Sequence, residues 1–174
     1  MSCQIPILGV LILFSLYTSA FGDIITVPGD QPTIQAAIGT AIDGDEIIVA
    51  LGTYFESITF LGKAITLRST DPSDPAVVAA TIIDATGLGQ VSVVLCNTSE
   101  GPDTILDGFT ITGGTGAHFD GIPTGGGMHN SHSSPTVTNC SFSGNAAYWG
   151  GAMFNLSSNV TVTNCTFTGN AATS

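Results

Sequence analysis

The C-terminal half of the chain alternates apolar and polar residues over very short stretches. Phe109-Thr110-Ile111 and Cys140-Ser141-Phe142 each place apolar side chains at every second position, with Thr or Ser between them. Alternation with a period of two is typical of a half-buried β-strand. Val137 is out of phase with the second of these strands, so we predict a bend at Asn139, because Asn tolerates left-handed backbone. The pattern therefore predicts short strands joined by sharp corners.

These strands recur with a period of 25 residues. The segments Gly125 to Trp149 and Gly150 to Ser174 align without a gap and are identical at 15 of their 25 positions. A weaker copy, Leu106 to Gly114, matches Val137 to Asn145 at an offset of 31 residues, and its six extra residues fall in the Gly-rich stretch from Thr115 to Thr124. Repetition of this kind indicates a repeat fold that tolerates a loop at one place.

Short strands joined by Asn and Gly corners favour an all-β chain folded as a right-handed parallel β-helix, a solenoid whose successive turns stack at about 4.8 Å. Helical repeats such as ankyrin and tetratricopeptide units are excluded because the chain lacks their periodicity, and the leucine spacing of leucine-rich repeats is absent. We expect Asn139 and Asn164 to form an amide ladder along the stack. The expected interior ladders are Met128/Met153, Val137/Val162, Cys140/Cys165 and Phe142/Phe167.

The N-terminal half predicts a cap for this stack. Between Thr33 and Ala41, apolar residues recur at helical spacing, and Asp30 and Pro32 precede them as start signals. We expect a short amphipathic helix that covers the open end of the first turn. Three strand signals follow it and are expected to form that first turn: Ile47-Ile48-Val49, Ile58-Thr59-Phe60 and Ile65-Thr66-Leu67.

The first residues predict export. An apolar run from Ile5 to Leu16 is followed by small residues up to Ala20, which is typical of a secretory signal peptide, although no Lys or Arg precedes the run. An uncleaved membrane anchor and a buried strand remain as alternatives. We therefore expect a secreted, cell-surface or outer-membrane-associated protein. The expected organisation is a signal peptide at 1–22, the cap helix and first turn at 23–69, and β-helix turns at 70–174.

Charge and cysteine content limit the partners and cofactors that the protein can have. The chain has 2 Lys and Arg against 13 Asp and Glu, a net charge of −11, so nucleic acid and anionic membranes are excluded as partners. Three cysteines remain after signal cleavage, with no C-x-x-C pair, which argues against a zinc site. We expect no metal or other cofactor. Calcium remains the alternative, held by turn acids without a 12-residue loop or a nonapeptide motif: Asp43, Asp45, Asp71, Asp74 and Asp84.

One local cluster combines titratable and aromatic side chains. His118-Phe119-Asp120 lies in the Gly-rich stretch, and His129 and His132 follow nearby, so these five residues are the candidate binding residues. Binding residues concentrate on loops held by a rigid scaffold. The candidate catalytic residues are Asp107, Asp120 and His118. The acids stand singly along the chain, whereas glycoside hydrolysis needs two carboxylates at a controlled separation.

Two stretches resemble a known superfamily. The run from Val27 to Ser69 resembles the N-terminal cap and first turn of the pectin lyase-like parallel β-helix superfamily. The GGxMxN…TNCxFxGN units resemble repeats of bacterial secreted β-helix proteins, including chlamydial polymorphic outer membrane proteins. The resemblance implies the fold more than an activity, because the superfamily holds lyases, hydrolases, esterases, adhesins and inert stalks.

The catalytic motifs of that superfamily are incomplete in this sequence. Gly52 to Glu56 matches the GxYxE motif of pectin methylesterases, but the later motifs of the QDTL, DFIFG and LGRPW kind are absent, so we interpret it as a turn with Tyr54 packed under the cap. Pectate lyases resemble this chain in fold but need a cation-rich groove, and Lys63 and Arg68 are the only cations here.

The sequence therefore favours a non-catalytic exported module that acts as a surface, adhesive or glycan-contacting scaffold, with a polysaccharide or cell-surface glycan as partner. The alternative is a carbohydrate-active enzyme, a polysaccharide lyase, a glycoside hydrolase or a pectinesterase-like protein, whose catalytic turn is divergent or lies beyond these residues. The last residues complete a repeat with no capping segment. We accordingly expect the solenoid to continue in a longer chain or to stack end to end.

Overall fold

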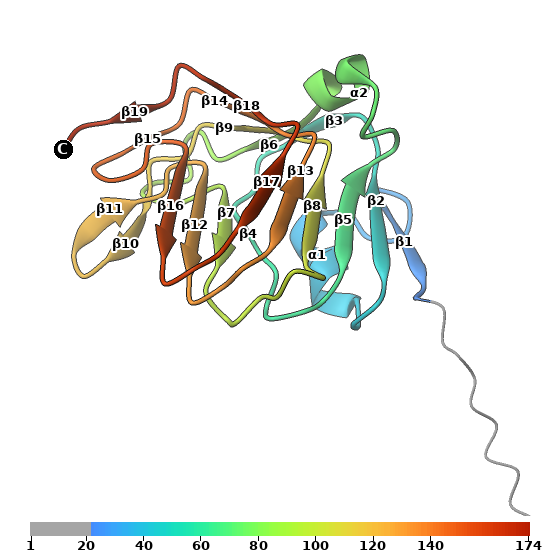
Figure 1. Cartoon of the computed structure of the whole chain (residues 1–174). Coiled ribbons are helices and arrows are strands. Elements are labelled where there is room, and N and C mark those ends of the chain that lie inside the picture. Colours follow the sequence, from blue (N-terminus) through green and yellow to red (C-terminus); the bar gives the residue numbers. More distant parts are fainter. Residues whose placement is uncertain (1–21) are drawn as a thin grey trace, which may run out of the picture.

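Most strands of the chain lie in three parallel sheets, which we name A, B and C (Figure 1). The computed structural model describes residues 22–174, so the predicted signal peptide lies almost wholly outside the described residues. Sheet A contains β1 (Ile24–Val27), β2 (Glu46–Val49), β5 (Thr66–Ser69), β8 (Ile105–Asp107), β13 (Thr136–Thr138) and β17 (Thr161–Thr163). Sheet B contains β3 (Gly52–Tyr54), β6 (Thr81–Asp84), β9 (Thr110–Thr112), β14 (Ser141–Ser143) and β18 (Thr166–Thr168). Sheet C contains β4 (Ile58–Thr59), β7 (Val94–Cys96), β12 (Met128–Ser131) and β16 (Met153–Leu156).

The chain visits sheets A, B and C in rotation. From β2 it passes to β3 and β4, and it then returns to sheet A at β5, beside β2. Each later round adds one strand to each sheet in the same order, until the described residues end in sheet B and in the short parallel pair β15 (Ala146–Ala147) and β19 (Ala171–Ala172). The fold is thus mainly β with stacked parallel sheets, an arrangement consistent with the predicted solenoid.

The 25-residue repeat sets the register of the last two rounds. Met128 pairs with Met153, Val137 with Val162 and Phe142 with Phe167, as the alignment predicts. Asn139 has a φ of 51° and Asn164 one of 53°, which confirms the predicted bend between sheets A and B. The Nδ2 of Asn164 donates to the Oδ1 of Asn139 at 3.4 Å, so the amide ladder is also present.

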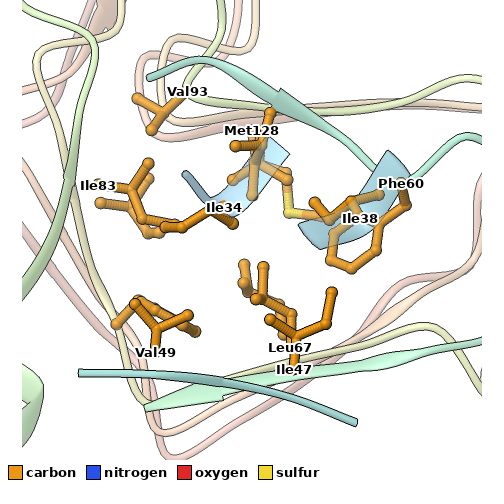
Figure 2. Packing of buried hydrophobic residues seen from close by; sticks show 14 of the residues in the cluster. Ile34, Ile38, Ile47, Val49, Phe60, Leu67, Ile83, Val93 and Met128 are labelled. Carbon is orange, nitrogen blue, oxygen red and sulfur yellow. The ribbon is translucent and has the colours of Figure 1, made fainter. Parts of the chain in front are cut away.

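The predicted cap helix is α1 (Ile34–Thr40), and it closes the N-terminal end of the core. Thr33 caps it by accepting a hydrogen bond from the backbone N–H of Ala36. Ile34, Ala37 and Ile38 are fully buried. In Figure 2, Ile34 and Ile38 lie among inward-pointing side chains from the surrounding strands, including Ile47, Leu67, Ile83 and Met128.

Two features of the N-terminal half differ from the prediction. The strand signal at Ile65–Leu67 becomes β5, which pairs with β2 in sheet A and so begins the second round instead of completing the first. The first round obtains its middle strand from β3, which the pattern did not predict because the strand is only three residues long and begins with Gly52, a weak strand former. A second short helix, α2 (Pro75–Ala80), was also missed; Asp74 caps it and Pro75 occupies its first turn.

Buried polar side chains connect successive rounds at the corners. Asn145 is fully buried; its Oδ1 accepts from the N–H of Gly114 at 3.0 Å and its Nδ2 donates to the carbonyl of Ile111 at 2.9 Å. The same Nδ2 donates to the Oδ1 of Asn170 one repeat later, at 3.0 Å. Backbone that turns a corner inside the stack cannot use the sheet ladder, so this amide satisfies it instead.

Glu100 has the corresponding role at the corner between sheets C and A. Its carboxylate is buried and accepts hydrogen bonds from the N–H groups of Gly62 and Thr98 and from the hydroxyl groups of Thr98 and Ser133. Burial raises the pKa of Glu100, but the hydrogen bonds from Thr98 and Ser133 outweigh burial and hold the pKa below its ordinary value. A charged carboxylate thus connects three rounds of the chain.

We predict that Asn145→Ala destabilises the protein by about 1–3 kcal/mol, because it leaves the buried N–H of Gly114 without its partner. The matched control is Asn164→Gly, which removes an exposed ladder amide, tolerates the φ of 53° at this position and should cost less than about 1 kcal/mol. Equilibrium denaturation followed by circular dichroism measures both free energies of unfolding. Equal effects of the two substitutions would contradict this assignment.

We also predict that Glu100→Gln lowers the free energy of unfolding at pH 7. The NH2 group of the new amide would face N–H and O–H groups that now donate to the carboxylate. The folded-state pKa of Glu100 lies below its unfolded value, so its stabilisation is present above that value and is lost as the pH falls through the folded pKa. Stability measured from pH 7 to pH 3 should therefore fall less steeply in the variant. Parallel profiles would show that Glu100 titrates alike in both states.

Candidate functional site

The Gly-rich stretch that carries the candidate binding residues folds as an ordered hairpin. Strands β10 (Ala117–Phe119) and β11 (Ile122–Thr124) pair antiparallel, and Asp120 and Gly121 form the turn with φ values of 51° and 79°. Two positive φ values in a two-residue turn match the right-handed twist of a hairpin. In Figure 1 the hairpin projects from the stack beside β12 and β16.

Side chains and backbone of the neighbouring rounds hold the hairpin in place. The hydroxyl of Ser92 accepts from the N–H of Ala117 at 3.0 Å and donates to the carbonyl of Thr124 at 3.2 Å. On the other side, the N–H groups of Tyr148 and Trp149 donate to the carbonyl of Pro123 at 3.0 and 3.2 Å. The hairpin is therefore fixed to the rounds before and after it.

The structure brings only part of the predicted cluster together. The rings of Phe119 and His129 lie 6.1 Å apart, whereas His118 and Asp120 are exposed on the hairpin and its turn. His132 is exposed at the far end of β12, where its Nδ1 contacts the hydroxyl of Ser131 at 3.1 Å. His118, Asp120 and His132 are thus placed as solvent-facing residues that share no contact with one another.

Three residues that the sequence analysis missed complete an aromatic cluster. Phe154 lies 5.5 Å from His129 and 6.4 Å from Phe119, measured between ring centroids. Trp149 stacks on Phe154 at 6.3 Å, with an interplanar angle of 13°, and Tyr148 lies 5.8 Å from Trp149. We call these five residues the aromatic cluster: Phe119, His129, Tyr148, Trp149 and Phe154.

A signal for this cluster was present in the repeat alignment. His129 and Phe154 occupy equivalent positions in β12 and β16, and they pair in register on one face of sheet C. Alternation with the interior positions Met128 and Met153 leads to the interpretation that both residues are outward and variable. That interpretation is incomplete, because the hairpin covers His129 and leaves it only 4% exposed.

His129 contributes to the cluster as a neutral ring. Burial lowers its pKa below the ordinary 6.5, and the hydrogen bond that Thr124 provides offsets this only in part. Its Nδ1 lies 2.8 Å from the hydroxyl of Thr124. A neutral, buried imidazole stabilises the hairpin on sheet C by packing, as Phe154 does one round later.

The exposed part of the cluster can form an aromatic platform with two facets, because the rings of Tyr148 and Trp149 are tilted by 58° to each other. Tyr148 is 46% exposed and Trp149 is 38% exposed, while Phe154 and the buried His129 support them from below. Aromatic rings with one apolar face and a polar edge stack on the apolar faces of sugar rings and still donate hydrogen bonds. Asp120, exposed in the turn of the same hairpin, is a hydrogen-bond acceptor.

The remaining catalytic candidate, Asp107, lies away from the hairpin on sheet A. It accepts from the Nδ2 of Asn139 at 2.8 Å and is paired in register with Arg68. Burial raises the pKa of Asp107, although Asn139 and Arg68 act in the opposite direction. Arg68 itself forms a salt bridge with Glu46. The structure therefore does not bring Asp107 together with Asp120 or His118.

The GxYxE motif has a structural explanation. The two carboxylate oxygens of Glu56 accept from the N–H groups of Ile34 and Gln35, at 3.0 and 2.9 Å, so Glu56 caps α1 from the following round. The hydroxyl of Tyr54 donates to the carbonyl of Ala50 at 2.9 Å, and its ring packs against the core. Both side chains of the motif are thus engaged in holding the cap.

The turn acids considered for calcium also bond to local backbone. Asp45 accepts from the N–H groups of Asp23 and Ile42, and the other four acids each accept from a backbone N–H near a corner or helix start. Within residues 22–174, no group of three or more His, Cys, Asp or Glu side chains is arranged to hold a metal ion. No helix in the same range is long and apolar enough to cross a membrane.

A groove of about 340 Å³ lies between α2 and the corner of sheets A and B. Pro72, Pro75 and Val78 form its apolar wall, and polar side chains from three rounds face them: Thr110, Asn139, Ser141, Asn164 and Thr166. Cys140 also lines the groove, and no carboxylate, histidine, lysine or arginine does.

Comparison of the chain with models of protein families, with curated proteins and with solved structures finds no match.

We predict that protonation of His129 destabilises the fold. Its folded-state pKa is lowered, so the unfolded chain binds a proton first and the free energy of unfolding should decrease as the pH falls below about 6.5. The variant His129→Phe should remove this decrease between about pH 6.5 and 5.5. Phe is the residue found at the equivalent position of β16. Thermal unfolding across this pH range measures the change in stability, and a decrease of equal size in the variant would contradict the prediction.

Proposed function

We propose that the chain is an exported, non-catalytic module of the pectin lyase-like class, folded as a right-handed parallel β-helix that presents a glycan-contacting surface. The rotation of the chain through three parallel sheets supports the fold, and the apolar N-terminal run supports export to the surface or the medium. The observation that carries the proposal is the aromatic platform of Tyr148 and Trp149, held by the hairpin on a rigid stack.

The chemistry of the surface favours a neutral sugar polymer. Charged residues make up 9% of the chain, and the outward positions of sheets A and B near the repeats are mostly Thr and Ser. Hydroxyl groups and aromatic rings together recognise sugars through hydrogen bonds and stacking. An anionic polysaccharide would be repelled by a net charge of −11.

The catalytic candidates support a scaffold more than an enzyme. Asp107 is on sheet A, whereas Asp120 and His118 are exposed on the hairpin, so the three do not converge on one reacting atom. The raised pKa of Asp107 is the one observation that favours a carbohydrate-active enzyme, because a general acid needs such a shift. An acid acting alone lacks the second carboxylate that hydrolysis requires.

We predict that the protein binds a neutral polysaccharide and that Trp149→Ala weakens binding by about tenfold or more, as expected for a central aromatic contact. Affinity electrophoresis through gels containing each member of a polysaccharide panel measures the retardation. Phe55→Ala is the matched control, because Phe55 is 65% exposed but lies outside the aromatic cluster, and it should bind as the unsubstituted chain does.

Two results would overturn the proposal. The first is a folded, β-rich sample that binds no polysaccharide, or whose binding is unchanged by Trp149→Ala. The second is turnover of a polysaccharide, measured as new reducing ends or unsaturated products, that Asp107→Asn abolishes. The second result would establish the enzyme instead of the scaffold.

A further inference from the structure

Two cysteines one repeat apart occupy equivalent places in the stack. β13 pairs in register with β17, and β14 with β18, so Cys140 and Cys165 follow the same bend on neighbouring rounds. Neighbouring strands lie about 4.8 Å apart. That spacing falls within the range of about 4.4–6.8 Å that the Cα atoms of a disulfide span.

The sulfur atom of Cys165 lies against the backbone of Cys140. The N–H of Cys140 donates to the Sγ of Cys165 at 3.4 Å. Each thiol also contacts the carbonyl two residues before it, Cys140 that of Thr138 at 3.1 Å and Cys165 that of Thr163 at 3.3 Å. Each sulfur is turned toward the preceding round: Cys165 Sγ lies 3.7 Å from the carbonyl of Val137, and Cys140 Sγ lies 3.8 Å from that of Leu106. The Cys165 sulfur is therefore beside Cys140, and a bond between the two requires the Cys140 side chain to rotate toward it.

The two thiols differ in reactivity. Hydrogen bonding from Cys140 lowers the pKa of Cys165 to about 7, although burial opposes this. Burial raises the pKa of Cys140 well above its ordinary value. Cys165 is half-buried and Cys140 is buried, so Cys165 is the thiol that a reagent meets as a thiolate.

The groove of about 340 Å³ beside α2 reaches this corner. Cys140, Asn139, Asn164 and Thr166 line it, whereas Cys165 does not. Cys165 is reached instead from its own half-exposed side. Cys96, the third cysteine of the described residues, is fully buried in β7 of sheet C and does not line the groove.

We propose that Cys140 and Cys165 form a modification site at which a small-molecule disulfide, such as oxidised glutathione, installs a disulfide bond between successive rounds. The Cys165 thiolate attacks one sulfur of the reagent, the reagent S–S bond breaks, and one thiolate leaves. Cys140 then loses its proton and attacks the Cys165 sulfur, displacing the second thiol. The protein dithiol is oxidised and the reagent is reduced to two thiols, a reaction suited to the oxidising compartments of exported proteins. This inference does not depend on glycan binding.

The test is peptide mapping of the full chain after incubation with oxidised glutathione at pH 8. Residual thiols are alkylated in acid, and chymotrypsin then cuts between the two cysteines at aromatic residues such as Phe142 and Trp149. We expect the peptides of Cys140 and Cys165 to be joined, two hydrogen atoms lighter than their sum, and to separate on reduction. The rate of the first step, measured as loss of the free Cys165 thiol, should rise with pH to half its maximum near pH 7, the pKa of Cys165. The joining step needs the Cys140 thiolate and should keep rising at higher pH, because the pKa of Cys140 is raised.

Single substitutions distinguish the two roles. Cys140→Ser should accumulate a mixed disulfide on Cys165, Cys165→Ser should leave Cys140 unmodified, and Cys96→Ser should form the cross-link as the unsubstituted chain does. Two free thiols at equilibrium in the unsubstituted chain, or a stable mixed disulfide without the cross-link, would overturn the proposal. Because the mapping is done on that chain, the result holds even where a variant fails to fold.

Discussion

The structure depends on in-register parallel pairing between successive rounds of the chain. Each residue of a round lies directly beside its equivalent in the next round, so ladders of apolar side chains build the core. A buried polar residue can interrupt such a ladder, as Ser69 does beside Val49. Val137 and Phe142 are fully buried in such ladders, and their partners Val162 and Phe167 are 41% and 50% exposed at the last described round. The same constraint explains why the last two repeats are so similar.

The backbone N–H and C=O groups that the sheet ladders leave without partners lie at the corners of the stack, where the sheets end. Asn145 and Glu100 satisfy these groups with buried hydrogen bonds to two or three rounds at once. Small residues allow the backbones to approach there: a Cβ on Gly126 would lie 2.3 Å from the carbonyl oxygen of Gly151. The corners are therefore fixed by specific residues, whereas the outward faces of the strands are free to vary.

The hairpin of the candidate site is an insertion that the stack tolerates. The six extra residues of one round form a hairpin without disturbing the pairing of β9 with β14 or of β7 with β12 on either side. Because the stack is rigid, the hairpin holds Phe119 over His129 and connects through Pro123 to Tyr148 and Trp149. The proposed glycan-binding platform and the proposed cysteine modification site thus lie on separate parts of one scaffold.

The sequence by itself determined the repeat, its register, the bend at Asn139 and the capping helix, because each is encoded in residues close together or one period apart. It also identified His118, Phe119 and Asp120 of the hairpin as candidate binding residues. Only the tertiary structure decided that His129 is buried, that Glu56 caps α1 and that Tyr148, Trp149 and Phe154 join Phe119. These contacts join residues at separations that match no local period, and they arise where an insertion folds back on neighbouring rounds. Such a contact depends on the direction in which the loop leaves the stack, which no pattern along the chain records.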